Sequence, residues 1–412
     1  MQDVLERCMG LDIHRDTIVA CLMEGQEDRQ PTAEIRTFGT MRPQMQQLRD
    51  WILASGCQYV AMESTGIYWQ PIYELLEDCF DGNMHLLVVN ARHMKNVPGR
   101  KTDIRDAEWI ATLLRAGLLK GSFVPDKPFR ELRHLTRYRK SIIRDITSQK
   151  NRIDKFLQSS GFRLSQFLSD TFGASGRNIM NHLSTYGELN RETLDLCLKT
   201  QTRKKIDDIL IAVNGSLSKH QMQFLSMMLT HLDQLIEHRK TVEAAIEQEI
   251  SRHGQALLLL RSIPGIDVTS ASAILAEIGT DMSCFPSSEH ICSWAGLAPG
   301  NHESAGKRKS VAVNKGNPYI KTMLCEVAWV VASHRELYLS GWYWRVKQQR
   351  GAKRATIALA RKLLVLIFTM LRTGELYNEQ YFETRRLSCE RKRASRMISE
   401  LTRLGYRVES PA

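Results

Sequence analysis

The sequence is short of the features that mark disulfide-rich, zinc-binding and membrane-spanning proteins. Its nine cysteines are scattered, with no Cys-x-x-Cys pair and no Cys/His cluster at zinc-ligand spacing. Its longest apolar run, residues 363–371, is far shorter than a membrane span. Acidic residues appear within the first six positions, so we expect no signal peptide. These absences predict a protein of the reducing cytoplasm, without disulfides and without a membrane partner.

Acidic residues are also in deficit. The 412-residue chain has 57 Lys and Arg against 45 Asp and Glu, which gives a formal net charge of +12. This excess predicts a polyanionic partner, nucleic acid before membrane. The length is sufficient for two or three domains with a substantial core.

Residues 9 to 119 alternate between strand and helix patterns. Strands are predicted at 9–13, 17–23, 34–38, 59–64 and 85–90, and helices at 43–54 and 69–79. A further helix is predicted after a basic linker, with Thr102 or Asp103 as its N-cap. This order predicts an α/β domain with a mixed sheet.

Four acids occupy related places in these elements. Asp12 lies within the first strand, and Glu63 ends the fourth. Asp103 and Asp106 are three residues apart and share one face of the next helix. Each acid alone is explained as a turn, strand-end or capping residue. If the two strands are neighbours, however, the carboxylates converge and repel one another unless divalent cations lie among them. The joint pattern predicts a site for Mg²⁺ or Mn²⁺ that is suited to phosphoryl transfer.

From residue 127 the chain is predicted to be helical. Two long helices, near 129–157 and 221–250, carry heptad-like apolar seams, which predicts an antiparallel hairpin or a coiled coil between subunits. The first is strongly basic, which favours phosphate contact over a merely solvated face. Residues 257–279 resemble a helix-hairpin-helix motif around Gly265. The turn of that motif either meets a phosphate or belongs to a plain packing unit.

A loop of small residues at 294–310 contains a basic cluster. Its glycine spacing is not that of a P-loop. Ser304 is either a nucleophile toward phosphate, assisted by the cations that follow it, or an ordinary DNA-contacting serine. Asn317 and Pro318 predict a helix start, and residues 355–371 predict a buried helix. The basic tail from residue 383 is expected to fold only on a polyanion.

Several longer stretches resemble one known family. Residues 60–69 and 90–109 are similar to the DEDD transposases of bacterial insertion sequences, the IS-one-ten group, which are related to the pilin-gene inverting recombinases. Residues 263–265 and 294–307 resemble the second conserved block of that family. The resemblance covers approximately residues 9 to 370.

The resemblance implies an α/β RNase H-like (RuvC-like) N-terminal domain with a mixed sheet. An α-helical coiled-coil segment and a mostly α-helical C-terminal domain would follow. We place the catalytic domain at residues 1–125, the helical linker region at 126–255, the C-terminal transposase domain at 256–375 and the basic tail at 376–412.

The resemblance also implies a function. It makes Asp12, Glu63, Asp103 and Asp106 the catalytic metal-binding set and a serine the nucleophile, which we assign to Ser304 with Ser310 as the alternative. The predicted protein is a DNA transposase or site-specific recombinase that moves an insertion sequence through a covalent phosphoserine link. It would act as a dimer or tetramer on the ends of the element and on target DNA, and some members of the family are guided by a structured non-coding RNA. The serine is far from the acids in sequence, so the site would combine two domains or two subunits.

Two other functions remain open. One is a metal-dependent, RuvC-like endonuclease of DNA junctions that uses water as its nucleophile, and the other is a non-catalytic nucleic-acid-binding protein. The predicted nucleic-acid contacts are Arg100, Lys101, Arg105, Arg137, Arg139, Lys140, Gly265, Lys307, Arg308, Lys309 and Lys315.

Overall fold

The computed structural model describes residues 5–26, 30–64, 66–78, 84–90, 106–299, 302–304, 307–310, 313 and 315–406. For residues 302–304 and 307–310, and for part of the last helix, it describes the backbone alone. The chain forms two compact units, Met1–Val124 and Pro125–Ala412. Each unit is described by itself.

The first unit is built on a mixed sheet in the strand order β3-β2-β1-β4-β5. Strands β1 (Arg7–Ile13), β2 (Thr17–Glu24) and β3 (Thr32–Gly39) are antiparallel neighbours. Strands β4 (Tyr59–Glu63) and β5 (His85–Val89) continue the sheet parallel to β1. The predicted mixed sheet is confirmed, and β1 and β4 are indeed neighbours.

Different helices cover the two faces of this sheet. Helices α1 (Arg42–Ala54) and α2 (Gln70–Glu77) share a core with Met9, Leu11 and Ile13 of β1. Helix α4 (Asp106–Arg115) packs on the other face, where Cys8 is buried. Because successive strand residues point to opposite faces, the side of β1 that holds Cys8 also holds residues 10 and 12.

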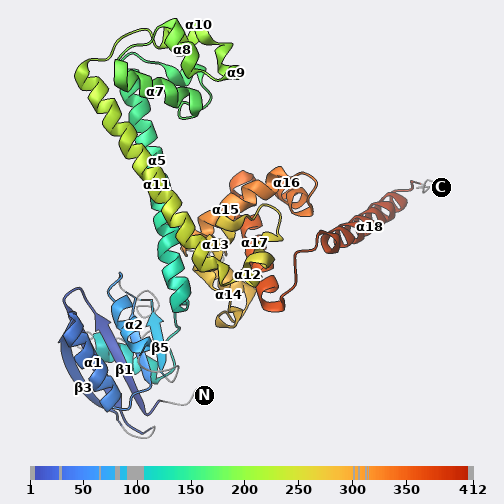
Figure 1. The fold of residues 1–412 in the computed structure, drawn as a ribbon. Coiled ribbons are helices and arrows are strands. Elements are labelled where there is room, and N and C mark those ends of the chain that lie inside the picture. The colour runs from blue at the N-terminus through green and yellow to red at the C-terminus, as the bar shows by residue number, and fades with distance from the viewer. Residues whose placement is uncertain are drawn as a thin grey trace. The chain divides into compact units, whose positions relative to one another are not determined.

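The second unit begins with a long antiparallel helix pair (Figure 1), formed by α5 (Lys127–Ser159) and α11 (Lys219–Ser251). Contacts run in opposite directions along the two helices. Arg139 pairs with Glu243, and the Gln149 amide donates to the Met228 carbonyl at 3.0 Å. The buried seam includes Ile142, Ile146, Ile153, Leu225, Met228 and Leu232. The pair therefore forms within one chain, which is the first of the two predicted alternatives.

Short helices cluster at one end of this pair (Figure 1), and all of them except α9 (Thr200–Arg203) contribute buried residues to its core. They are α6 (Leu164–Phe167), α7 (Ala174–Tyr186), α8 (Arg191–Cys197), α9 (Thr200–Arg203) and α10 (Ile206–Ala212).

The rest of the second unit is mostly helical. Its elements are α12 (Gly254–Arg261), α13 (Val268–Ile278), the short helix η1 (Met282–Cys284), α14 (Ser288–Trp294), β6 (His302–Ser304), β7 (Lys307–Ser310), α15 (Pro318–Ser333), α16 (Tyr338–Arg350), α17 (Ala352–Thr373) and α18 (Glu379–Arg403). Asn317 caps α15 as predicted, because its Oδ1 accepts from the Tyr319 amide at 2.9 Å. The predicted buried helix is α17, in which Thr369 is the one exposed residue between positions 355 and 371.

The basic tail contains a helix. Residues 379–403 form α18. Two local features support the helix. Asn378 accepts from the Gln380 amide as an N-cap, and Arg403 in the last turn complements the helix dipole.

The structure bears on two of the absences noted in the sequence. Cys8 and Cys21 are fully buried, and burial raises the pKa of the Cys8 thiol to about 12. Among the described helices, none is both long enough and apolar enough to cross a membrane.

Candidate active site

Asp12 stands on the face of β1 that is covered by α4. Two residues earlier, Gly10 lets the helix come unusually close. A Cβ at position 10 would lie 2.3 Å from the Ala107 carbonyl oxygen and 2.5 Å from the Ala111 amide nitrogen. Only glycine allows this approach, which brings the first turn of α4 beside the end of β1.

Glu63 reaches the same region through strand pairing. Strands β1 and β4 are parallel, with Gly10 opposite Ala61 and Leu11 opposite Met62. Ala61 belongs to the core under α4, so Glu63, two residues later, points to that same face. The carboxyl ends of two parallel neighbours therefore bring Asp12 and Glu63 together.

Asp106 completes the arrangement that the described residues show. It is the first residue of α4, directly before the Ala107 carbonyl that touches Gly10. Burial is the main cause that raises the pKa of Asp12, and the nearby carboxylates of Asp106 and Glu63 raise it further. Two of the other predicted acids thus lie close enough to Asp12 to affect its pKa. Asp103, the fourth, lies outside the described residues, as do Arg100, Lys101 and Arg105.

The donor set suits a hard divalent cation. Carboxylate oxygens are the ligands that Mg²⁺ and Mn²⁺ prefer, and a cation would compensate both the burial of Asp12 and the like charges of Asp106 and Glu63 that raise its pKa. Within the described part of the chain, no group of three or more Asp, Glu, His or Cys side chains already has the spacing of a metal site. The three acids therefore fit a metal in chemistry and neighbourhood, without forming a closed set of ligands.

His14 is a neighbour of this site that was not among the predicted site residues. Its Nε2 lies 3.1 Å from Oδ2 of Asp12, and this contact opposes the rise in the pKa of Asp12. The signal was its position two residues after Asp12, which places both side chains on one side of an extended chain.

The segment around Ser304 is a β-hairpin. Strands β6 and β7 are antiparallel, with Ser304 opposite Lys307 and His302 opposite Ser310. Ser304 therefore stands at the end of β6 next to the turn, and Ser310 stands at the other end of the ladder. Arg308 and Lys309 belong to β7, and Lys315, which follows the hairpin, is exposed.

The two chain segments that connect the hairpin to the helical body contact each other, and we call this region the base of the hairpin. Pro299 and Val313 form an antiparallel bridge, and the Asn317 amide donates to the Trp294 carbonyl at 3.1 Å. A Cβ on Gly316 would lie 2.2 Å from the amide nitrogen of Gly296, so the two chain segments touch there. The start of α15 thus determines where the hairpin begins and ends.

Two of the three predicted nucleic-acid contacts on α5 are already engaged by acids of this chain. Arg137 makes a two-pronged ion pair with Glu277, with distances of 2.8 and 2.9 Å, and its guanidinium lies 4.2 Å from the centre of the Tyr319 ring. Arg139 binds Glu243 at 2.7 Å. A phosphate would have to compete with these carboxylates for both guanidinium groups.

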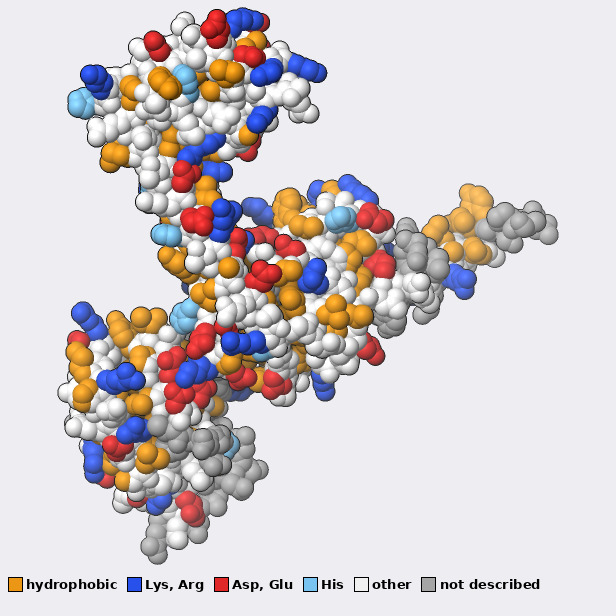
Figure 2. Space-filling model, in the orientation of Figure 1, with side chains coloured by type: hydrophobic (Ala, Val, Ile, Leu, Met, Phe, Trp, Pro, Cys, Tyr) orange, Lys and Arg blue, Asp and Glu red, His pale blue; other side chains and the backbone are white. Residues whose placement is uncertain are grey.

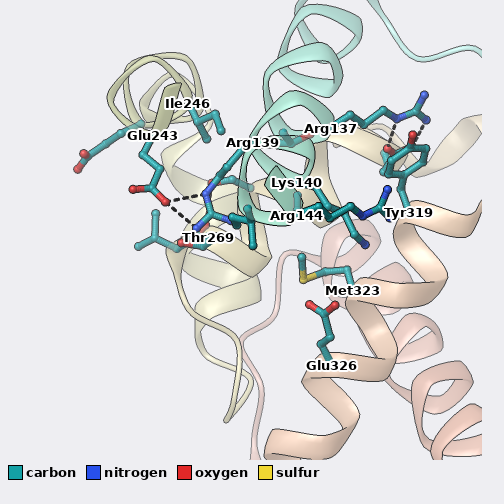
Figure 3. Close-up of a pocket in the computed structure, with 17 residues that line it drawn as sticks. Arg137, Arg139, Lys140, Arg144, Glu243, Ile246, Thr269, Tyr319, Met323 and Glu326 are labelled. Carbon is teal, nitrogen blue, oxygen red and sulfur yellow. Dashed lines mark hydrogen bonds and ion pairs between the residues drawn. The ribbon is translucent and has the colours of Figure 1, made fainter. Parts of the chain in front are cut away.

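These residues line a cavity of about 500 Å³ between α5, α11, α13 and α15 (Figure 3). Arg139 with Glu243 stands at one side and Arg137 with Tyr319 at the other, while Lys140 and Arg144 lie between them. Glu247 and Glu326 also line it. The lining therefore has as many acids as bases. On the face shown in Figure 2, basic and acidic side chains likewise alternate along the α5–α11 pair.

The segment around Gly265 has the two helices and the turn of a helix-hairpin-helix motif. Helices α12 and α13 flank a turn in which Gly265 has φ +88°, and a Cβ there would lie 3.2 Å from side-chain atoms of Val330 and Val331. At the start of α13, the Asp267 carboxylate accepts from the Ser270 amide at 2.7 Å. This acid occupies the helix N-terminus that a phosphate would need, so the geometry favours the packing unit.

Two family models match the chain. A transposase model of the DEDD type from the IS110 group matches residues 9–161, and the model described as "Transposase IS116/IS110/IS902 family" matches residues 257–343. The first match contains Asp12, Glu63 and Asp106, and the second contains the hairpin with Ser304. The chain therefore contains two IS110-family transposase domains.

Relatives carry corresponding names. The insertion element IS110 43.6 kDa protein of Streptomyces coelicolor is 26% identical over 308 residues, which cover 69% of this chain and 74% of that protein. The transposase of element IS1111A from Coxiella burnetii is 30% identical over 29% of this chain and 33% of its own length. The pilin gene-inverting protein of Moraxella bovis is 31% identical over 30% of this chain and 39% of its own length. Most of these curated relatives are matched over less than half of their length.

Proposed function

We propose that this protein is a DNA transposase or site-specific recombinase that mobilises an insertion sequence by DNA cleavage and strand exchange. One observation carries the proposal. Parallel pairing of β1 with β4 and the close approach of α4 to Gly10 place Glu63 and Asp106 near Asp12, within a chain that contains two IS110-family transposase domains. A purely structural role would not need three like charges at this place.

The strand order β3-β2-β1-β4-β5, antiparallel on one side and parallel on the other, supports an RNase H-like assignment of the first unit. In this proposal Asp103 joins Asp12, Glu63 and Asp106 to hold Mg²⁺ or Mn²⁺. Such ions neutralise charge on the phosphate that reacts. The first unit is then the catalytic domain, and the helical region, the C-terminal transposase domain and the basic tail follow it.

Ser304 is the proposed nucleophile. Its Oγ attacks the phosphorus of the scissile phosphodiester, and the bond from phosphorus to one sugar oxygen breaks. Overall, the serine proton is transferred to the departing sugar oxygen. A sugar hydroxyl of the exchanged strand then attacks the phosphoserine, which re-forms the phosphodiester and releases the serine. The cations of β7 are suited to stabilising charge on the phosphorus oxygens.

The proposed partners are the ends of the insertion sequence, target DNA, further copies of this chain as a dimer or tetramer, and a structured guide RNA. The formal charge of +12 favours such polyanions. In this proposal Lys307, Arg308, Lys309 and Lys315 contact nucleic acid around the serine hairpin, and Lys140 contacts it on α5.

The test is a covalent trapping assay. The protein is incubated with Mg²⁺, RNA transcribed from the element and labelled DNA spanning the element ends, and the products are separated on a denaturing gel. We expect a DNA-linked protein band that is lost in Ser304→Ala, kept in Ser310→Ala and lost when the metal is chelated.

Two outcomes would favour the alternatives. Nicked DNA without a protein-linked band, undiminished in Ser304→Ala, would indicate a water-using junction endonuclease. DNA binding without any metal-dependent cleavage would indicate a non-catalytic binding protein.

A further inference from the structure

Glu277 is an acid of α13 that is almost completely buried, with 3% of its side chain exposed. A carboxylate in such a place is costly unless charged or hydrogen-bonding partners surround it. Arg133 Nε lies 3.2 Å from its Oε2, and Arg137 binds both oxygens. Asn317 Nδ2 donates to Oε2 at 2.6 Å. Three separate segments of the chain therefore meet on this one side chain.

Arg133 strengthens the junction from the backbone side. Its guanidinium also donates to the carbonyl oxygens of Ala276 and Glu277, at 3.2 and 2.7 Å. These carbonyls belong to the last turn of α13, where the backbone lacks partners inside the helix. Helix α5 is thus bound to the C-terminal end of α13 through both backbone and side chain.

Asn317 links this junction to the serine hairpin. Its side-chain oxygen caps α15, its side-chain nitrogen binds Glu277, and its own amide donates to the Trp294 carbonyl at the base of the hairpin. One residue therefore connects the buried carboxylate, the first turn of α15 and the end of the hairpin. Ser304 stands on that hairpin beside its turn.

We propose that Glu277 and Asn317 are positioning residues, which hold the base of the β6–β7 hairpin against α5 and α13 and so direct Ser304 toward the scissile phosphate. This inference rests on the proposed function. In this inference the pair acts through the place where the hairpin leaves the body, and not through contact with the reacting atoms.

The decisive variant is Asn317→Asp. Aspartate caps helices as well as asparagine does, so the start of α15 is kept. The group that faced Glu277 becomes an acceptor, however, and two carboxylates then meet at hydrogen-bond distance. The matched control is Asn190→Asp, which makes the same change at the N-cap of α8. The rescue is the double variant Asn317→Asp with Glu277→Gln, which restores one donor and one acceptor and keeps one negative charge.

Two measurements follow. Amide hydrogen exchange tests the hairpin without any reaction, and we expect faster exchange in residues 299–317 of Asn317→Asp. Single-turnover trapping at saturating DNA tests the chemistry. We expect the DNA-linked product to form about 10- to 100-fold more slowly, with an unchanged Kd for DNA, because a displaced nucleophile loses its alignment. Asn190→Asp should match the wild type in both, and the double variant should recover most of the rate.

Exchange in residues 299–317 that equals the wild type in Asn317→Asp would overturn the inference, whatever the chemistry. So would a double variant as slow as the single one, or an equal loss in Asn190→Asp. Failure of the proposed function is recognised separately, because a DNA-linked band that persists in Ser304→Ala removes the serine mechanism but leaves the exchange result interpretable.

Discussion

The two units place acidic side chains inside the protein in opposite ways. In the first, Asp12 keeps 13% of its side chain exposed and has the carboxylates of Asp106 and Glu63 as electrostatic neighbours. In the second, Glu277 is more deeply buried and is surrounded by two guanidinium groups and an amide. One environment raises the pKa of its acid, and the other supplies positive charge and donors.

This difference distinguishes the candidate metal site at Asp12 from the structural junction at Glu277. At Glu277 the protein itself supplies the compensating charge, so the carboxylate stabilises the fold. At Asp12, burial together with the neighbouring carboxylates outweighs the contact with His14 and raises the pKa, so a cation from outside would lower the energy of the folded state. Removing the charge should therefore reduce activity at the first acid and stability at the second.

The largest effect is expected for Asp12→Asn. It should lower metal-dependent DNA cleavage at least about 10²- to 10³-fold, the scale of losing one catalytic electrostatic group. Its melting temperature should not fall, because the substitution relieves repulsion. The control is Asp16→Asn, an exposed acid of the next turn, which should keep full activity. A strongly destabilised Asp12→Asn protein would show that this acid is structural, and the contrast drawn between Asp12 and Glu277 would then be wrong.

Glu277→Ala should have the converse effect on stability. Removing one partner of a buried ion pair typically costs about 3–5 kcal/mol, because the remaining charges stay buried. Denaturant unfolding of the second unit measures this change. Glu243→Ala removes the more exposed partner of Arg139 and should cost about 1 kcal/mol or less. Equal losses of unfolding free energy in Glu277→Ala and Glu243→Ala would contradict the inference that the buried Glu277 junction stabilises the fold more than an exposed ion pair does.

Gly10→Ala tests how the acids are brought together. The added Cβ would meet the backbone of α4, so we expect destabilisation by about 1–3 kcal/mol and reduced cleavage. Gly341→Ala is the matched control, since this glycine lies within α16 with nothing within 4 Å of its added Cβ. That change should stabilise the helix by about 0.5–1 kcal/mol. A Gly10→Ala protein with wild-type stability would argue against the close approach of α4 to β1.

The smallest effect concerns the cap of α13. Burial acts to raise the pKa of Asp267, but hydrogen bonds from the Ser270 hydroxyl and amide outweigh it, so the pKa lies below its usual value. An acid with a lowered pKa stabilises the fold above its unfolded pKa of about 4 and loses this contribution as the pH falls through the folded pKa. Asp267→Ala should cost about 1 kcal/mol at pH 7 and progressively less below about pH 4.

Ser218→Ala controls for pH, because the Ser218 hydroxyl caps α11 without carrying a charge. Unfolding free energies of both variants and the wild type are compared between pH 7 and pH 3. If the loss of unfolding free energy decreases equally in Asp267→Ala and Ser218→Ala as the pH falls, the Asp267 carboxylate is not the cause.

Local patterns were sufficient for the elements of the first unit and for the candidate acids. Short apolar runs between turn residues predicted the strands of the sheet, because each strand is a continuous segment of the sequence. The Asn317–Pro318 cap predicted the start of α15 for the same reason, since a cap involves only neighbouring residues. The acids could be selected as candidates because acids rarely occur in buried strands without a cause.

Only the tertiary structure decided which charges neutralise one another. Arg137 was predicted as a nucleic-acid contact, yet its carboxylate partner lies 140 residues further along the chain. Only the packing of α4 on β1 explains why position 10 is a glycine. Asn317 likewise connects the N-cap of α15, the buried Glu277 and the base of the β6–β7 hairpin only in the folded chain. The sequence by itself determined the strands of the sheet, the long helices and the residue types available for chemistry, whereas the strands β6 and β7 lie in a segment that was predicted as a loop. The partners of a side chain depend on distances between segments that are remote in the sequence, and local sequence patterns carry no information on these distances. Only the folded chain therefore distinguishes the candidate site at Asp12 from the junction at Glu277.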